Sequence, residues 1–104
     1  MTEVLQNDEY ERRFAGVAKI YGEDSFNHYE QSHVMVIGIG GVGSWAVEAL
    51  ARTGLGELTL VDMDVIAASN INRQLPAMTT TLGHEKIEVM AERCRAINQE
   101  LKLI

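Results

Sequence analysis

The sequence is poor in cysteine, in signal-like segments and in long hydrophobic runs, and each shortage excludes a class of protein. A single cysteine, Cys94, has no partner for an internal disulfide, so a disulfide-stabilised secreted domain is excluded. The first fifteen residues are polar and contain acids, unlike a signal peptide. No apolar run reaches the roughly 18 residues of a membrane-spanning helix. We therefore expect a cytoplasmic protein with no membrane partner.

Basic residues and metal ligands are also scarce. The formal net charge is −6, and an acidic chain does not attract nucleic acid through its overall field. If the substrate is RNA, this segment is not expected to be the part that grips it. The three histidines show no metal-ligand spacing, and we predict no metal site among these residues. The length of 104 residues with 46% hydrophobic residues suits one small globular domain.

Residues 34–62 carry the strongest pattern in the chain. An apolar run is followed by a glycine cluster, an amphipathic stretch and a second apolar run that ends at Asp62, which predicts strand, tight turn, helix and strand. Glycines let the main chain approach a phosphate, and a helix start offers unpaired N–H groups and a positive dipole end. An acid about 20 residues beyond such glycines is placed to bind a ribose hydroxyl. We predict a nucleotide site formed by Asp62 and the four glycines Gly38, Gly40, Gly41 and Gly43.

The remaining periodicity predicts an α/β protein. Two strands and the beginning of a third are too few for a complete doubly wound fold. We therefore expect the N-terminal part of a Rossmann-like doubly wound parallel sheet, preceded by one or two helices, with 1–32 as a helical segment and 33–104 as the first, truncated part of the nucleotide-binding domain. The predicted helices cover 8–21, 24–31, 42–53 and a stretch from about 83. The predicted strands cover 33–38, 57–62 and the start of a strand at 101–104. Trp45 and Cys94 are expected in the core.

The identity of the nucleotide depends on cations beyond the second strand. A dinucleotide can be held largely by backbone N–H groups, whereas adenylyl transfer from ATP needs cations aimed at the triphosphate. Arg73 and Lys86 are the candidates. The residues alone also allow Arg73 to be an ordinary loop arginine and Lys86 to be a solvated side chain balanced by Glu85 and Glu88. An NAD- or FAD-binding oxidoreductase segment and a non-enzymatic interaction module stay open as alternatives.

Several segments together resemble a known family. GIGGVGS at 38–44, VDMDVIAASNINRQ at 61–74 and LGHEK at 82–86 resemble the ubiquitin-activating-enzyme-like adenylating family. That family includes the enzymes that adenylate the carrier proteins of molybdopterin and thiamine synthesis. RFAGVAKIYGEDSF at 13–26, and Trp45 after GVGS, are most similar to its tRNA threonylcarbamoyladenosine dehydratase branch. The resemblance covers about residues 10–100.

The resemblance implies an ATP-dependent enzyme that activates a carboxylate by attack on the α-phosphate and releases pyrophosphate. In this branch the carboxylate belongs to a threonylcarbamoyl group on a tRNA adenosine, and its adenylate then cyclises; a carrier protein is the alternative substrate. The resemblance also implies a homodimer. It places the ligand for Mg²⁺ beyond Ile104, so these 104 residues are expected to be inactive alone. The implied ATP-binding residues are the four glycines, Asp62 at the ribose with Asp64 beside it, Asn70, Arg73, Gln74 and Lys86 at the phosphates, and Arg13 from the neighbouring protomer.

Overall fold

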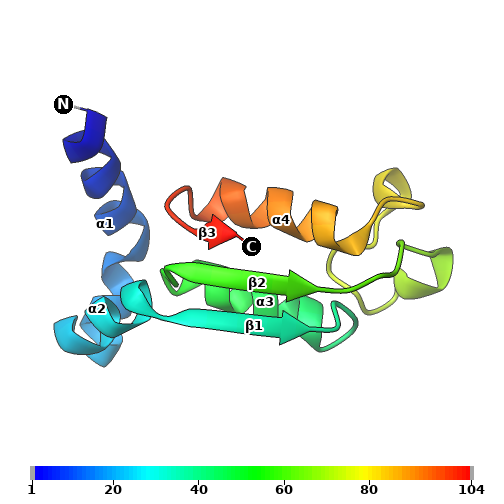
Figure 1. Ribbon diagram of the computed structural model, residues 1–104, viewed down its shortest axis with the longest axis horizontal. Coiled ribbons are helices and arrows are strands. Elements are labelled where there is room, and N and C mark those ends of the chain that lie inside the picture. The colour runs from blue at the N-terminus through cyan, green and yellow to red at the C-terminus, as the bar shows by residue number, and fades with distance from the viewer. Residues whose placement is uncertain (1, 104) are drawn as a thin grey trace.

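The computed structural model describes residues 2–103 and confirms the α/β class and the predicted order of elements (Figure 1). Its helices and strands follow the apolar periodicity of the sequence. The long connection predicted at 63–82 contains two short 3₁₀ helices, η1 and η2. The elements are α1 (Thr2–Tyr21), α2 (Glu23–Gln31), β1 (His33–Ile37), α3 (Gly43–Arg52), β2 (Glu57–Val61), η1 (Ala68–Asn70), η2 (Thr79–Thr81), α4 (Lys86–Ile97) and β3 (Lys102–Leu103).

The three strands form one parallel sheet in the order β1-β2-β3. His33 lies opposite Glu57 at one end of the β1–β2 pair, and Ile37 lies opposite Val61 at the other. β3 pairs with the beginning of β2, which confirms the strand predicted near residue 101. Parallel neighbours need crossover connections, and α3 and α4 provide them. All three strands therefore direct their carboxyl ends toward the same side, where the loops after β1 and β2 lie (Figure 1).

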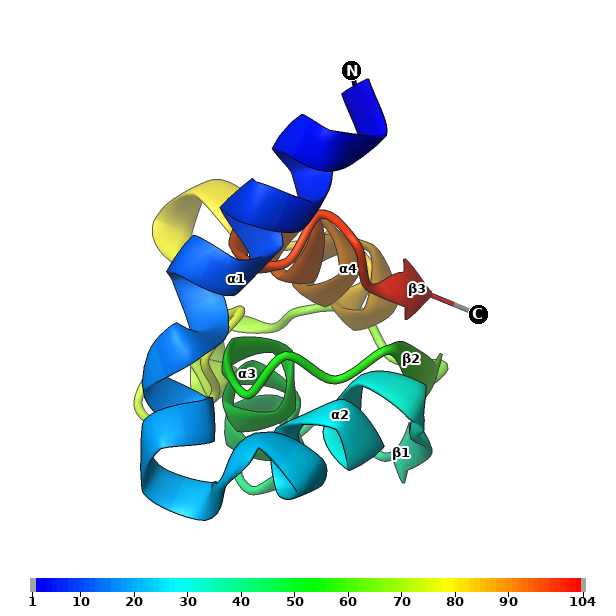
Figure 2. The same ribbon diagram turned by 90° about the vertical axis from the view of Figure 1, so that its left-hand side faces the viewer.

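Helices α3 and α4 pack on the same face of this sheet (Figures 1 and 2). The inward side chains of the strands alternate with outward ones, as period-2 patterning requires. Cys94 is fully buried among them, and burial raises its pKa to about 11, so its thiol is neutral near pH 7 and not a ready nucleophile. This confirms the prediction for Cys94. The buried core comprises Ile39, Val47, Ala51, Leu55, Leu58, Leu60, Met90, Cys94 and Leu101.

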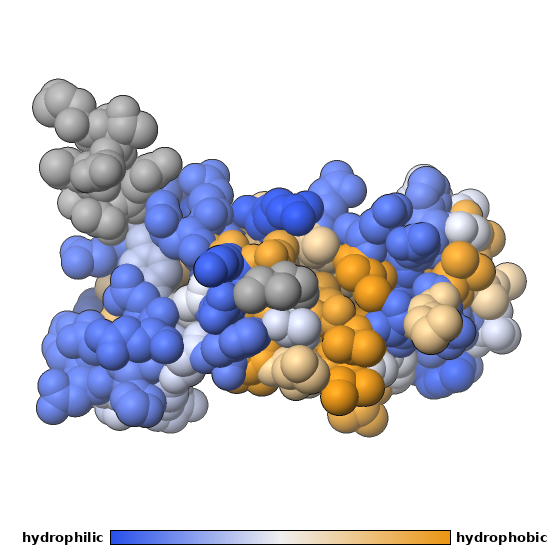
Figure 3. All heavy atoms as spheres, in the orientation of Figure 1, coloured by the Kyte–Doolittle hydropathy of each residue, from blue (hydrophilic) through white to orange (hydrophobic). Residues whose placement is uncertain are grey.

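Within the residues that the structure describes, the opposite face of the sheet is exposed. Met35 and Ile37 on β1 are 57% and 74% exposed, and Val61 on β2 is 40% exposed. Figure 3 shows apolar side chains gathered over this part of the molecule. Parallel sheets in α/β proteins usually have both faces covered. In residues 2–103, helices therefore cover one face of the sheet, whereas a complete doubly wound fold has helices on both faces.

The two N-terminal helices lie at the end of the sheet where the strands begin (Figure 1). Tyr10, Phe14 and Phe26 form a second apolar cluster, and the Tyr10 hydroxyl donates a hydrogen bond to the Gly54 carbonyl. Helix α1 begins at Thr2, six residues before the predicted start at residue 8. Among the described residues, no helix has the length and apolar character needed to cross a membrane.

An ion-pair network joins the two helices that cover the sheet. Glu48 on α3 accepts hydrogen bonds from Arg93 on α4, with Nε to Oε1 at 2.7 Å and Nη2 to Oε2 at 2.9 Å. Arg52 Nε also donates to Glu48 Oε2 at 2.9 Å. The side chain of Glu48 is 12% exposed. Bidentate pairs of this kind are the strong form of ion pair and fix geometry as well as charge.

Replacement of Glu48 by Gln tests this network through its pH dependence. The hydrogen bonds from Arg93 lower the pKa of Glu48 below 4.5, outweighing the opposing effect of burial, with Arg52 adding to the shift. A lowered pKa stabilises the fold above pH 4.5, and that contribution is lost as the pH falls toward the folded-state pKa. We expect Glu48→Gln to cost about 1–2 kcal/mol at pH 7 and less at an acidic pH below 4.5. Urea unfolding at pH 7 and at the lower pH measures this, and an equal loss at both would contradict it.

Candidate nucleotide site

The turn after β1 is built on glycines for steric reasons at two of its positions. Gly38 has φ +90°, a conformation that other residues rarely adopt, and its N–H donates to the Val61 carbonyl at 2.8 Å. A Cβ on Gly43 would lie 1.8 Å from the carbonyl oxygen of Gly38. Only glycine allows the first residue of α3 to approach the end of β1 this closely.

The two glycines between them are not required by the chain itself. Gly40 and Gly41 have no positive φ, and a Cβ on either would meet only side-chain atoms at 3.5 Å or more. Within the described residues, the N–H groups of 40–42 donate no hydrogen bond, and α3 begins without a side-chain cap. Free N–H groups at a helix start suit an anion. The main chain of 40–42, with the side chains of Gln74 and Arg73 over Gly40 and Gly41, is therefore a place where an anionic ligand can bind.

Asp62 follows directly after β2 and faces this turn. Its carboxylate accepts the N–H of Ile39 at 2.7 Å and the N–H of Asp64 at 2.7 Å. Burial raises the pKa of Asp62, but these two hydrogen bonds and the positive charge of Lys86 outweigh it, so the pKa is lowered below 3.8. Asp62 is thus ionised at neutral pH. Each carboxylate oxygen keeps a free lone pair that can accept a further hydrogen bond.

The connection after β2 folds back on itself and brings α4 to the same place. Val65 forms an isolated antiparallel bridge with Glu85, and the N–H of Lys86 donates to the Asp64 carbonyl at 3.2 Å. Gly83, with φ +84°, makes the turn, and its N–H donates to the Ile66 carbonyl at 2.9 Å. This pairing delays the start of α4 to Lys86, three residues after the predicted position.

Lys86 is buried beside the two aspartates. Its side chain is 7% exposed, and its Nζ lies 3.9 Å from Asp64 Oδ2. The alternative of a solvated lysine is therefore wrong. A separation of 3.9 Å is long for a charge-assisted hydrogen bond, which is typically about 2.8 Å. Lys86 also occupies the first position of α4, where a cation opposes the helix dipole. The ammonium is held close to acids without a tight partner among the described residues.

Arg73 and Gln74 reach the glycine turn from the loop after η1. The aliphatic part and Nε of Arg73 lie over Gly41, and Nη1 donates to the Ser69 carbonyl at 3.1 Å and to Asn72 Oδ1 at 3.0 Å. Gln74 is buried next to Gly40, and its Oε1 has no hydrogen-bond partner within the described chain.

Asn70 lies in the same loop and closes its turn. Its Oδ1 accepts the N–H of Ala67 at 2.9 Å, and its carbonyl accepts the N–H groups of Arg73 and Gln74 at 3.2 and 3.0 Å. The ordinary turn role is therefore present in the structure, and contact with a phosphate stays a prediction for this residue. Asn70 shapes the segment from which Arg73 and Gln74 project.

Trp45 does not pack in the core as predicted. Its side chain is 53% exposed, and its Nε1 donates a hydrogen bond to the Arg73 carbonyl at 3.0 Å. The neighbouring Ser44 is buried, donates to the Gly40 carbonyl and accepts the N–H of Leu75 at 3.2 Å. The apolar character of tryptophan favoured a core position, and its indole N–H was the one signal of a polar contact.

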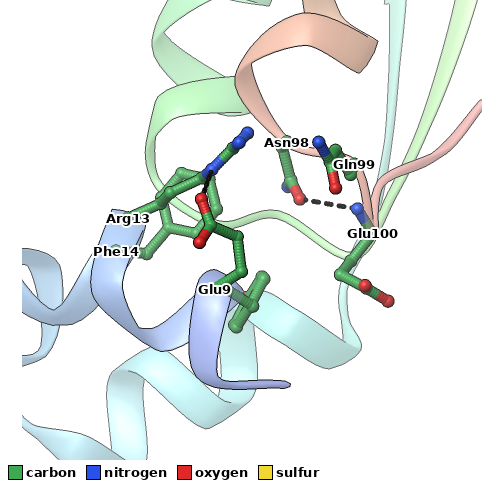
Figure 4. Close-up of a pocket in the computed structure, with 7 residues that line it drawn as sticks. Glu9, Arg13, Phe14, Asn98, Gln99 and Glu100 are labelled. Carbon is green, nitrogen blue, oxygen red and sulfur yellow. Dashed lines mark hydrogen bonds and ion pairs between the residues drawn. The ribbon is translucent and has the colours of Figure 1, made fainter. Parts of the chain in front are cut away.

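Arg13 lies far from this site within one copy of the chain. Its Nη1 donates to the Ile97 carbonyl at 3.0 Å, and its Nε bonds Glu9 at 3.0 Å (Figure 4). Ile97 ends the helix that Lys86 begins, so the two positions are about 16 Å apart along α4. The cavity beside Arg13 has a volume of about 10 Å³, the size of a single water. Arg13 therefore cannot join the other site residues without a second protomer.

The site residues do not form a metal cage of their own. Among the residues that the structure describes, no group of three or more histidine, cysteine, aspartate or glutamate side chains is placed to hold a metal ion. The two carboxylates at the site are already engaged: Asp62 accepts backbone N–H groups, and Asp64 lies beside Lys86. What the arrangement offers is an anion site made of main-chain N–H groups and two cations.

The chain is similar in sequence and in fold to known proteins. The model of the ThiF family matches residues 10–104. The tRNA threonylcarbamoyladenosine dehydratase of Haemophilus influenzae is 58% identical over 100 residues, which are 96% of this chain and 38% of that protein. Crystal structures of the Escherichia coli tRNA N6-threonylcarbamoyladenosine dehydratase in complex with ATP and with AMP both give a TM-score of 0.89 at 49% identity, covering 93% of this chain and 41% of theirs. The chain thus spans about two fifths of the length of these relatives.

Proposed function

Because this chain belongs to the ThiF family, we propose that it forms the ATP-binding part of a tRNA-modifying dehydratase that adenylates a carboxylate. The observation that carries the proposal is the meeting of Arg73, Lys86 and Asp62 at one glycine turn. A pyrophosphate alone needs no buried lysine. Two cations and a row of free N–H groups match the charge of a triphosphate.

In this proposal each group has a separate task. The N–H groups of 40–42 and the start of α3 bind phosphate oxygens, and Arg73 above Gly41 closes over them. The free lone pairs of Asp62 accept hydroxyl groups of the ribose. Gln74, with its unpaired Oε1 next to Gly40, completes the polar lining. The E. coli relative that binds ATP is 49% identical, which supports this assignment.

The reaction in this proposal is adenylyl transfer. A carboxylate oxygen of the substrate attacks the α-phosphorus, the bond to the β-phosphate oxygen breaks, and pyrophosphate leaves. Negative charge grows on the phosphoryl oxygens, and Lys86 and Arg73 stabilise it. Lys86 is effective because it is buried, where charges interact more strongly than in water. The neutral, buried Cys94 takes no part in this step, and in this proposal the substrate itself displaces the adenylate as it cyclises and AMP leaves.

The substrates and the assembly follow the relatives and are part of the proposal. Since relatives at 58% and 49% identity are tRNA dehydratases, we favour a threonylcarbamoyl-tRNA substrate over a carrier protein. Mg²⁺ would accompany ATP. Arg13 enters as a group supplied across a homodimer, because it lies about 16 Å from Lys86 along α4 in its own copy. A monomer in sedimentation equilibrium at concentrations that bind ATP would contradict the dimer.

Titration of the protein with ATP–magnesium and with NAD tests the nucleotide class. We expect tighter binding of ATP, and we expect Arg73→Ala to weaken it about 10-fold or more, because a charge-assisted contact to phosphate contributes about 1.5–3 kcal/mol. Arg95→Ala is the matched control, since Arg95 is exposed in the last turn of α4, far from the glycine turn. Calorimetry measures the four affinities: those of the wild-type protein for ATP and NAD, and those of the two variants for ATP.

Two results would remove the proposal. Preference for NAD would favour an oxidoreductase segment, because a dinucleotide does not require these cations. Equal ATP affinity of the wild-type protein and Arg73→Ala would show that the guanidinium does not bind phosphate. For the chemistry, failure of the full-length protein to exchange pyrophosphate into ATP in the presence of threonylcarbamoyl-tRNA would favour a non-enzymatic interaction module.

A further inference from the structure

The first turn of α3 holds the loop that carries Arg73. Trp45 Nε1 donates to the Arg73 carbonyl at 3.0 Å, across 28 positions of the chain. One residue earlier, Ser44 accepts the Leu75 N–H at 3.2 Å and donates to the Gly40 carbonyl. Two consecutive side chains thus connect the glycine turn, the helix start and the segment 73–75. We call this set of contacts the loop anchor.

We propose that Trp45 is a positioning residue for ATP, acting through Arg73. The inference rests on the proposed function above. Arg73 reaches the space over Gly41 at the end of the exposed stretch 67–73, and among the described residues its side-chain bonds go only to Ser69 and Asn72 in that stretch. The residues after it, 74–77, are held by burial, with Leu75 packed against the core. The exposed stretch therefore gains a separate tertiary contact from Trp45. The Trp45 bond holds the backbone of Arg73 itself, next to the atoms that set the direction of its side chain.

The exposure of Trp45 supports this assignment. A tryptophan side chain that is 53% exposed buries only part of its apolar area, so packing alone is a weak reason for its position. Its one polar atom is engaged with the loop, in good hydrogen-bond geometry. The same side chain occupies the edge of the proposed phosphate site, directly after the glycine turn. A base that stacks on the exposed indole is the other use of such a residue, and the experiment separates the two.

Trp45→Phe in the full protein is the first test, because it keeps an aromatic ring and removes the N–H donor. We expect ATP affinity to fall 3- to 10-fold and adenosine affinity to stay within twofold, because the anchor acts only on the phosphate end. In the Arg73→Ala background the same change should have no further effect on ATP affinity. Ile20→Ala is the control, since Ile20 is 75% exposed on α1, away from the glycine turn.

A second variant separates the N–H group from the ring. An amino-acid analogue in which sulfur replaces the indole N–H, placed at position 45, keeps the shape and the stacking surface. We expect it to behave like Trp45→Phe. Full ATP affinity with this analogue would overturn the proposal and leave stacking as the role of Trp45. Equal loss of ATP and adenosine affinity in Trp45→Phe would also overturn it, because that pattern reports a general loss of structure.

A third readout needs no nucleotide. Trypsin cleaves after Arg73, and a loop released from Trp45 should be cut faster. We expect at least a threefold faster cleavage at that bond in Trp45→Phe than in wild-type protein or Ile20→Ala, with unchanged cleavage after Arg95. An unchanged rate after Arg73 overturns the anchor. If the wild-type protein binds no ATP, the proposed function fails, and the cleavage rates still decide whether Trp45 holds the loop.

Discussion

Gly43→Ala is expected to destroy the glycine turn and ATP binding together. The new Cβ would lie 1.8 Å from the Gly38 carbonyl oxygen and 2.9 Å from its carbon. Both are backbone atoms, so no side-chain rotation relieves the overlap. Either the end of β1 or the start of α3 must move, and both elements contribute to the buried core. We expect a loss of about 3 kcal/mol or more in the free energy of unfolding, measured with urea and circular dichroism.

Gly41→Ala is the matched control and should separate folding from binding. A Cβ there meets only the Arg73 side chain, at 3.5 Å or more, and the backbone has no positive φ. Stability should change by less than about 1 kcal/mol. ATP affinity should fall about 10-fold, because the new methyl group contacts the Arg73 side chain and reduces the room for a phosphate between that side chain and the main chain. Wild-type ATP affinity in Gly41→Ala would exclude a phosphate from this turn, and wild-type stability in Gly43→Ala would contradict the turn geometry.

The strand–turn–helix–strand unit was predictable because its signals are local. The apolar runs that become β1 and β2, the glycines between them and the acid at 62 each follow from neighbouring residues. The observed strands end within one residue of the predictions at 33–38 and 57–62. The truncated parallel sheet with a third strand beginning near 101 was also predictable, from the length and the count of strands.

Local signals could not decide the position of side chains whose surroundings come from distant segments. Lys86 was compatible with a solvated surface position, because charge patterning in a helix does not report what lies above its first turn. The bridge between Val65 and Glu85 decides its burial, and nothing local predicts that pairing. Trp45 was assigned to the core from hydrophobicity alone, whereas its N–H bonds a carbonyl 28 positions away. Tertiary contacts of this kind outweigh the general preference of tryptophan for the core and of lysine for the surface.

Lys86→Met should separate function from stability more clearly than any other change in this chain. Lys86 is buried, opposes the helix dipole, and its nearest partner, Asp64 Oδ2, is 3.9 Å away. A buried charge without a tight partner costs free energy, and an apolar residue of similar length removes that cost. We expect stability without nucleotide to stay within about 1 kcal/mol of wild type or to rise. ATP affinity should fall about 30- to 150-fold, the equivalent of 2–3 kcal/mol for a lost charged contact.

The neighbouring carboxylate gives an independent check of the same substitution. The charge of Lys86 is one of the causes that lower the pKa of Asp62, so an NMR titration should show a higher Asp62 pKa in Lys86→Met. Lys102→Met is the control, because the side chain of Lys102 is 73% exposed and contacts Glu57 at the opposite end of the sheet. It should leave both ATP affinity and the Asp62 pKa unchanged. A large loss of stability in Lys86→Met would instead make Lys86 a structural counter-charge to the two aspartates, and unchanged ATP affinity would remove it from the phosphate site.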